Sequence, residues 1–383
     1  MTTKDLPPRT AEMCSYSLAA IAYPLGGNVA AMKLEMDILL NSLGHGALKV
    51  IWGGIAPAST LAPGDASEWN AALVIVVHKL GTHDYIVVSR GTNPLSWNSW
   101  KLEDFDVCTK VPWNSGDTSK GAVSNATNTA LSIHLGLSDG GKQLMQFLQG
   151  LASSDPDATF SFTGHSLGGC MAPVLALRFA ELSGIKRSRL SLYAYAGPTP
   201  GDAAFAAYMT SVFVSFALVS FVRDTEDVVP HAWNVGDLDL TTSLYPIRPA
   251  TNAVLKLVKY VQDCVSNNNY THAYPGFIPI LHEIELNEDI AKILDEGRLM
   301  SMSRESAALQ TSAWIKKELV RIDAFTEEEV LSGFLDTLAW FLCVMCMHVL
   351  PYLALCLAGA QSILFEKVIK PYYFKGHLAM PTT

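Results

Sequence analysis

Charged side chains are scarce in this sequence of 383 residues. Asp, Glu, Lys and Arg make up 16% of the chain, where about 25% is usual, and apolar residues make up 49%. Acidic residues (36) outnumber basic ones (27), and the formal net charge of 27 − 36 = −9 argues against a nucleic-acid-binding surface. The composition also argues against a disordered chain and favours a large interior or contact with lipid.

The sequence lacks the usual marks of a secreted protein. Its opening residues, MTTKDLPPRTAEMC, contain acidic residues and prolines where a cleavable signal peptide has a basic stretch and then an apolar core. The seven cysteines are an odd number, spread from Cys14 to Cys356, so we expect mostly reduced, buried thiols. These features predict a cytoplasmic protein or one exported without a leader; a trimmed sequence would look the same.

No phosphate-binding loop and no dinucleotide fingerprint is visible, so we expect no cofactor. Asp237 and Asp239 are too few to predict a calcium site. Cys343 and Cys346 form a C-x-x-C pair, but they lie in an apolar segment without a second ligand pair. This setting indicates packed thiols rather than a metal site.

Two long stretches contain no Asp, Glu, Lys or Arg. Residues 203–222 begin with an Ala-rich segment typical of a helix and continue with FVSFALVSFV, which is typical of a buried strand. Residues 337–365 are long enough to cross a bilayer, but His348 and Pro351 lie near the middle. We therefore expect a buried helix broken at the proline, with peripheral rather than integral membrane contact; a transmembrane anchor is the alternative.

From residue 69 onward, short β-branched runs alternate with longer helical segments. Strands are expected at residues 72–77, 85–89, 159–163, 190–196 and 217–222, and helices at 125–150 and 167–183. This alternation predicts an α/β fold with a mostly parallel sheet covered by helices. The charged, amphipathic segments between residues 234 and 330 predict a helical insertion or cap within a single domain, 1–383.

The sequence Gly164-His165-Ser166-Leu167-Gly168-Gly169 follows one expected strand and opens the next expected helix. On a sharp strand-to-helix turn, small neighbours give a serine nucleophile the room that its strained backbone needs. The helix start behind Ser166 also presents free N–H groups to a developing negative charge. Ser166 is therefore the candidate nucleophile; a structural glycine turn is the alternative.

A serine hydroxyl needs a histidine base that is oriented by a carboxylate, and after such a turn the acid precedes the histidine in the chain. Asp224, Glu226 and Asp227 lie at the end of the expected strand 217–222. The segment Asp227-Val228-Val229-Pro230 resembles the class 3 lipase family, whose members carry an Asp-x-Val-Pro type segment after a strand. The resemblance favours Asp227 as the acid, with Asp224 in reserve.

Two histidines are candidates for the base. His282, at 282 − 227 = 55 residues after Asp227, has the spacing of the compact fungal members, but its surroundings, PILHEIELN, do not match their motif. His348, at 348 − 227 = 121 residues, lies in FLCVMCMHVLPYL, which is similar to the Phe-x6-His-x3-Tyr-Leu context of bacterial members. We favour His348 on this resemblance. A base in an apolar stretch is physically sensible, because burial keeps an imidazole neutral at rest and Asp227 can stabilise the imidazolium formed during attack. A core histidine that bonds a backbone carbonyl is the alternative.

The resemblance also implies the donors that stabilise the oxyanion. Arg90-Gly91-Thr92 looks like the family's Arg-Gly-Ser/Thr segment, which places the N–H and the hydroxyl of Thr92 at that oxygen. The N–H of Leu167, next to the nucleophile, is the second donor. A plain hairpin turn at Gly91 is the alternative. The resemblance covers residues 85–233 in register and returns at 335–355.

Residues 93–105 occupy the position of the family's amphipathic lid. Trp97 and Trp100 are then expected to face the acyl site when the lid is closed and lipid when it is open. Aromatic side chains that only pack a helix onto the sheet are an equal alternative.

The resemblance implies an α/β-hydrolase that cleaves acylglycerols or other lipid esters at a lipid–water interface, through an acyl-enzyme on Ser166. The motif does not define the acyl pocket, so a phospholipase or short-chain esterase with the same triad is an alternative. A more distant alternative is a membrane-anchored interaction protein without catalysis.

Overall fold

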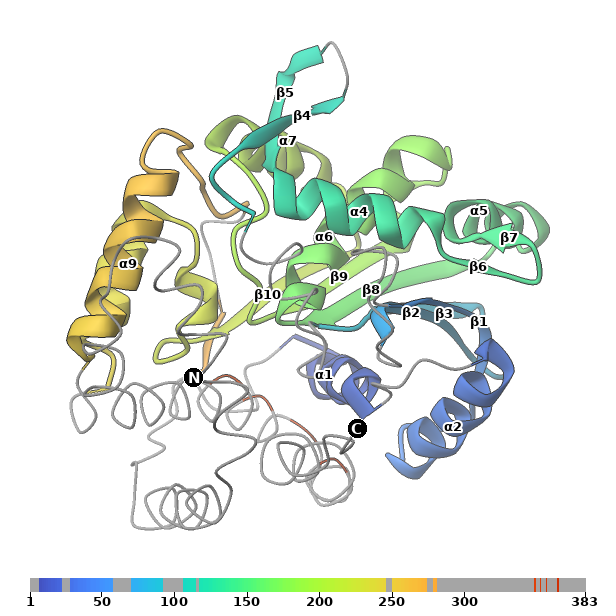
Figure 1. Cartoon of the computed structure of the whole chain (residues 1–383). Coiled ribbons are helices and arrows are strands. Elements are labelled where there is room, and N and C mark those ends of the chain that lie inside the picture. The colour runs from blue at the N-terminus through green and yellow to red at the C-terminus, as the bar shows by residue number, and fades with distance from the viewer. Residues whose placement is uncertain are drawn as a thin grey trace, which may run out of the picture.

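The computed structural model describes residues 7–22, 28–57, 70–91, 106–114, 117–245, 250–273 and 278–280, together with His348, Tyr352, Cys356 and Leu364. Within these residues a central sheet has the strand order β1-β2-β3-β8-β9-β10-β11 (Figure 1). The strands are β1 (Leu48–Pro57), β2 (Asn70–Lys79), β3 (Asp84–Ser89), β8 (Thr159–His165), β9 (Leu190–Tyr195), β10 (Leu218–Asp224) and β11 (Ile278–Ile280).

Neighbouring strands from β3 to β11 pair in parallel, whereas β1 and β2 add an antiparallel edge. The expectation of a mostly parallel sheet is therefore confirmed. All five expected strands are present as β2, β3, β8, β9 and β10, with ends within about two residues of those expected. Such strands are readable in the sequence because strands covered on both faces are continuous apolar runs.

Helices cover both faces of the sheet (Figure 1). One face carries α1 (Thr10–Ala19) and α2 (Val29–Ser42); the other carries α4 (Asn125–Gly136), α5 (Leu144–Ser154), α6 (Leu167–Leu182) and α7 (Ala203–Phe213). Alternate side chains of β2 enter two separate cores, because successive residues of a strand point to opposite faces. Ile75 packs in the core with α1 and α2, and Val76 packs in the core with α4, α5 and α6.

The smaller elements complete the described chain. They are η2 (Ala20–Ala22), β4 (Lys110–Asn114), β5 (Asp117–Ser124), β6 (Ser138–Asp139), β7 (Lys142–Gln143), η5 (Arg187–Arg189), η6 (Val229–His231), α8 (Val235–Leu238), η7 (Asp239–Thr242) and α9 (Asn252–Val265). The stretch 203–222 divides into helix α7 and most of strand β10, as expected. Helices expected between residues 281 and 330 lie outside the described residues, so the insertion stays a prediction.

The single helix expected over residues 125–150 is wrong. Helix α4 ends at Gly136, and a small β6–β7 hairpin separates it from α5. Gly140 and Gly141 turn the chain with φ angles of 56° and 78°, which a helix interior does not use. Asp139 then holds the hairpin on the sheet edge, where its carboxylate accepts hydrogen bonds from Lys33 Nζ (2.8 Å) and the N–H of Gly53 (3.1 Å).

No helix in the described part of the chain is long and apolar enough to cross a membrane. Most of residues 337–365 lie outside that part. The alternative of a transmembrane anchor there is therefore not tested.

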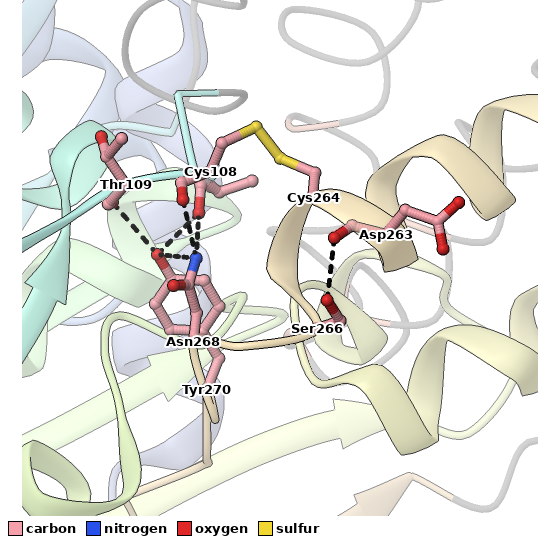
Figure 2. The surroundings of a disulfide bond; sticks show 8 residues. Cys108, Thr109, Asp263, Cys264, Ser266, Asn268 and Tyr270 are labelled. Atoms are coloured by element: carbon pink, nitrogen blue, oxygen red, sulfur yellow. Dashed lines mark hydrogen bonds between the residues drawn. A yellow bond between two sulfur atoms is a disulfide. The ribbon is translucent and has the colours of Figure 1, made fainter.

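A disulfide joins Cys108 to Cys264 at the end of α9, with a Cα–Cα distance of 4.9 Å (Figure 2). The expectation of reduced thiols is wrong for this pair, since partners 156 residues apart cannot be recognised from spacing. Hydrogen bonds reinforce the junction: Asn268 Nδ2 donates to the carbonyls of Val107 (2.9 Å) and Cys108 (3.1 Å), and the hydroxyl of Tyr270 donates to the carbonyl of Val107 (2.7 Å) (Figure 2). The chain just before β4 is thereby fixed to α9.

Removing this disulfide is expected to lower the free energy of unfolding by about 2–4 kcal/mol, because the bond closes a long loop and restricts the unfolded chain. The double variant Cys108→Ser/Cys264→Ser, unfolded in urea, measures this loss. Dithiothreitol should lower the wild-type midpoint and leave that of the double variant where it is. Equal stability of the two proteins without reductant would contradict the prediction.

Candidate active site

Ser166 lies between the last residue of β8 and the first residue of α6. Its backbone has φ 64° and ψ −129°, a conformation that costs a residue with a Cβ about 1–3 kcal/mol. The N–H of Ser166 donates to the carbonyl of Tyr195 in β9 (3.0 Å), and its side chain makes no capping bond to the helix. Ser166 is partly exposed between two buried neighbours, His165 and Leu167. The sharp turn expected from the sequence thus leaves the hydroxyl available for chemistry.

The turn is crowded by backbone on several sides, which explains its glycines. A Cβ at Gly168 would overlap the carbonyl oxygen of Ser89, at the end of β3. A Cβ at Gly91 would lie 2.6 Å from the carbonyl oxygen of His165 and 3.1 Å from the Cβ of Ser166. Residue 91 therefore passes directly beside the serine. Thr92, the next residue, lies outside the described residues, so its role as oxyanion donor stays a prediction.

His348 and Asp227 lie in contact although 121 residues separate them. His348 Nδ1 is 3.0 Å from Asp227 Oδ1 and 2.9 Å from Oδ2. Both residues are buried, with exposed fractions of 4% and 0%. Asp227 Oδ1 also accepts a hydrogen bond from the N–H of Val229 (3.0 Å), in the Asp-x-Val-Pro segment. An ionised Asp227 requires the proton on Nδ1, which leaves His348 Nε2 as the nitrogen able to accept one.

Part of the chain is similar to a known protein family. Residues 86–236 match the family described as Lipase (class 3). Over these residues the chain is similar to class 3 lipases. A curated lipase of Rhizomucor miehei is 38% identical over 77 residues, which span 20% of this chain and 20% of that protein. The family resemblance inferred from the sequence motifs is therefore confirmed.

Two solved lipase structures are also similar to this chain. The crystal structure of M37 lipase superimposes with a TM-score of 0.60 at 23% identity, covering 72% of this chain and 85% of that one. A lipase from Rhizopus microsporus var. chinensis gives a TM-score of 0.41 at 20% identity, covering 59% and 70%. The M37 comparison confirms the α/β-hydrolase fold.

A further polar residue, Tyr352, lies beside Asp227. Its hydroxyl donates to Asp227 Oδ2 (3.0 Å) and accepts from the N–H of Asp224 (2.9 Å). Tyr352 is fully buried, and burial together with the charge of Asp227 raises its pKa well above the usual value. The phenol therefore stays protonated and keeps donating to Asp227. The His-x3-Tyr spacing of residues 348–352 marks Tyr352 in the sequence, but it serves there only as support for His348 and gives Tyr352 no role.

Asp224, the reserve acid, makes no contact with His348 among the residues that the structure describes. Its Oδ1 accepts from the N–H of Glu226 (2.8 Å). Burial and then the nearby charge of Asp227 raise the pKa of Asp224 to about 7. The carboxylate in contact with His348 is therefore that of Asp227.

The raised pKa of Asp224 predicts a pH-dependent stability. The folded value, about 7, lies above the unfolded value of 3.8, so folding favours the protonated form. The stability of the wild type then falls as pH rises from about 4 to about 7. Asp224→Asn, which keeps an acceptor for Glu226, should be more stable than the wild type at pH 8 by about 2–4 kcal/mol and lose that advantage near pH 4. Urea unfolding at both pH values measures the difference; a constant difference would contradict it.

Three further candidates fall outside the described residues: Trp97 and Trp100 of the expected lid, and His282, the alternative base. The lid and the exclusion of His282 stay predictions. Among the described residues, no group of three or more His, Cys, Asp and Glu side chains is arranged to hold a metal ion.

Proposed function

We propose that this chain is a carboxylic ester hydrolase that cleaves lipid esters, with acylglycerols as the substrate class, through an acyl-enzyme on Ser166. The observation that carries the proposal is the buried His348–Asp227 pair, together with the contact between the carbonyl of His348 and His165, which directly precedes Ser166. The match of residues 86–236 to the class 3 lipase family supports the reaction type and the substrate class.

The candidate residues divide the steps of the reaction among them. His348 Nε2 takes the proton from Ser166 Oγ as that oxygen attacks the ester carbonyl, and Asp227 stabilises the imidazolium through Nδ1–H. The N–H groups of Leu167 and Thr92 hold the negative oxygen of the tetrahedral intermediate. When the intermediate collapses, the alkoxide leaves with the proton from Nε2 and the acyl group stays on Ser166. A water molecule, deprotonated by His348, then releases the fatty acid by the same steps.

The same match to the family and the low charged fraction of the chain support a lipid substrate. Trp97 and Trp100, in the expected lid, would present apolar surface to an interface. A phospholipase or soluble esterase would use the same triad. Hydrolysis of p-nitrophenyl esters of increasing chain length, with and without an emulsion, separates these candidates: a lipase gains rate at the interface and an esterase does not.

A fluorophosphonate probe tests the nucleophile directly. The probe should phosphonylate Ser166, and mass spectrometry of the tryptic peptides should locate one adduct there, because only an activated serine reacts. Ser166→Ala should not react. Ser153→Ala, at an exposed serine of α5, should react like the wild type. Labelling at another residue, or none in folded protein, would contradict the proposal and leave the membrane-anchored interaction protein as the rival.

A further inference from the structure

His165, the last residue of β8, contacts the segment that carries the candidate base. Its ring nitrogen Nε2 lies 2.7 Å from the backbone carbonyl oxygen of His348. The two imidazole rings are 4.6 Å apart between centroids, and the His165 ring meets the Tyr352 ring edge-on at 4.9 Å. Because a carbonyl oxygen only accepts hydrogen bonds, Nε2 of His165 must carry the proton.

This hydrogen bond links two parts of the site that the chain brings from far apart. His165 precedes Ser166 directly, and 183 residues separate it from His348. His165 is fully buried, so no water competes for the bond. The bond therefore fixes the backbone of the base relative to the turn that bears the nucleophile. The His348–Asp227 contact cannot do this, since it orients the ring but involves no atom of the turn.

The protonation state of the His165 ring also affects the base. Burial, and then the neighbouring His348, lower the pKa of His165 well below its usual value, so the ring is neutral. A protonated His165 at this distance would oppose formation of the His348 imidazolium. A neutral N–H donor is therefore the form that can hold the base without raising the cost of charging it.

We propose that His165 is a positioning residue, which rests on the proposed function of Ser166 and His348. Its Nε2–H holds the carbonyl of His348 and thereby sets the separation between the base and the Ser166 hydroxyl. His165 does not exchange protons with the substrate. Its loss is expected to slow proton transfer and to leave substrate binding unchanged.

A matched pair of substitutions tests this role, because methionine and glutamine have nearly the same length and shape but only glutamine has an N–H donor at its end. We expect His165→Met to lower kcat and the rate of fluorophosphonate labelling by about 10²-fold with an unchanged KM, the effect typical of a misplaced catalytic group. His165→Gln should restore both rates to within about tenfold of the wild type. Thermal melts of both variants report whether the fold is kept.

Three results would overturn the proposal: wild-type kcat in folded His165→Met, equal loss in both variants, or a loss that appears in KM alone. If His165→Met does not fold, ¹⁵N NMR of histidine-labelled wild type decides. Nε2–H and a resonance that does not titrate between pH 5 and 9 are expected for His165; a titrating ring or an Nδ1–H tautomer would overturn it. Failure of wild-type protein to label at Ser166 would instead contradict the proposed function.

Discussion

Replacing His348 with alanine is expected to lower kcat by about 10⁴-fold or more, because no other group then takes the proton from Ser166 Oγ. KM should change little, since the imidazole acts on the reacting bond rather than on the acyl chain. Steady-state hydrolysis of a short ester, and the rate of fluorophosphonate labelling, both measure the loss. Labelling should fall with kcat, because it needs the same activated oxygen.

Two controls make the result specific to the base. His348→Gln keeps most of the side-chain volume and offers Asp227 an N–H, so it should fold and still lose the activity. His282→Ala should keep activity within about tenfold of the wild type. If His282→Ala is inactive and His348→Ala turns over normally, the base has been assigned to the wrong histidine.

The sheet could be predicted from the sequence because its signals are local. The run 72–77 is buried throughout, so it reads as a strand without reference to any partner. Helix α1 gave no comparable signal. It is buried nearly all round, so the apolar stripe that marks a surface helix is absent, and hydrogen bonds such as that from the Tyr195 hydroxyl to the Thr10 carbonyl (2.6 Å) hold it from distant strands.

The candidate site likewise contains residues with a local sequence signal and residues without one. Ser166 and Asp227 lie in short motifs whose glycines and proline can be read directly from the chain. The contacts of Tyr352 with Asp227 and of His165 with His348 join residues more than 100 positions apart, and only the fold brings them together. The Cys108–Cys264 bond was missed for the same reason. The reacting groups can therefore be recognised from the sequence more readily than the residues that hold them in place.

Replacing Asp227 with asparagine is expected to lower kcat by about 10⁴-fold, although the change is nearly isosteric. An amide NH₂ facing Nδ1 of His348 favours the tautomer with the proton on Nε2, and that nitrogen can then no longer accept the proton of Ser166. The variant should fold, because an amide oxygen in place of Oδ1 still accepts from the N–H of Val229, and the hydroxyl of Tyr352 can accept from the amide NH₂ in place of Oδ2. KM should stay near the wild-type value.

Asp224→Asn is the matched control, since it changes a second buried carboxylate in the same turn that makes no described contact with His348. Its kcat should stay within about tenfold of the wild type, because the backbone N–H that Asp224 gives to Tyr352 is kept. Assays at pH 8 with both variants compare the two carboxylates under one condition. If Asp224→Asn loses the activity and Asp227→Asn keeps it, the carboxylate that touches His348 in the structure is not the one that orients it during catalysis.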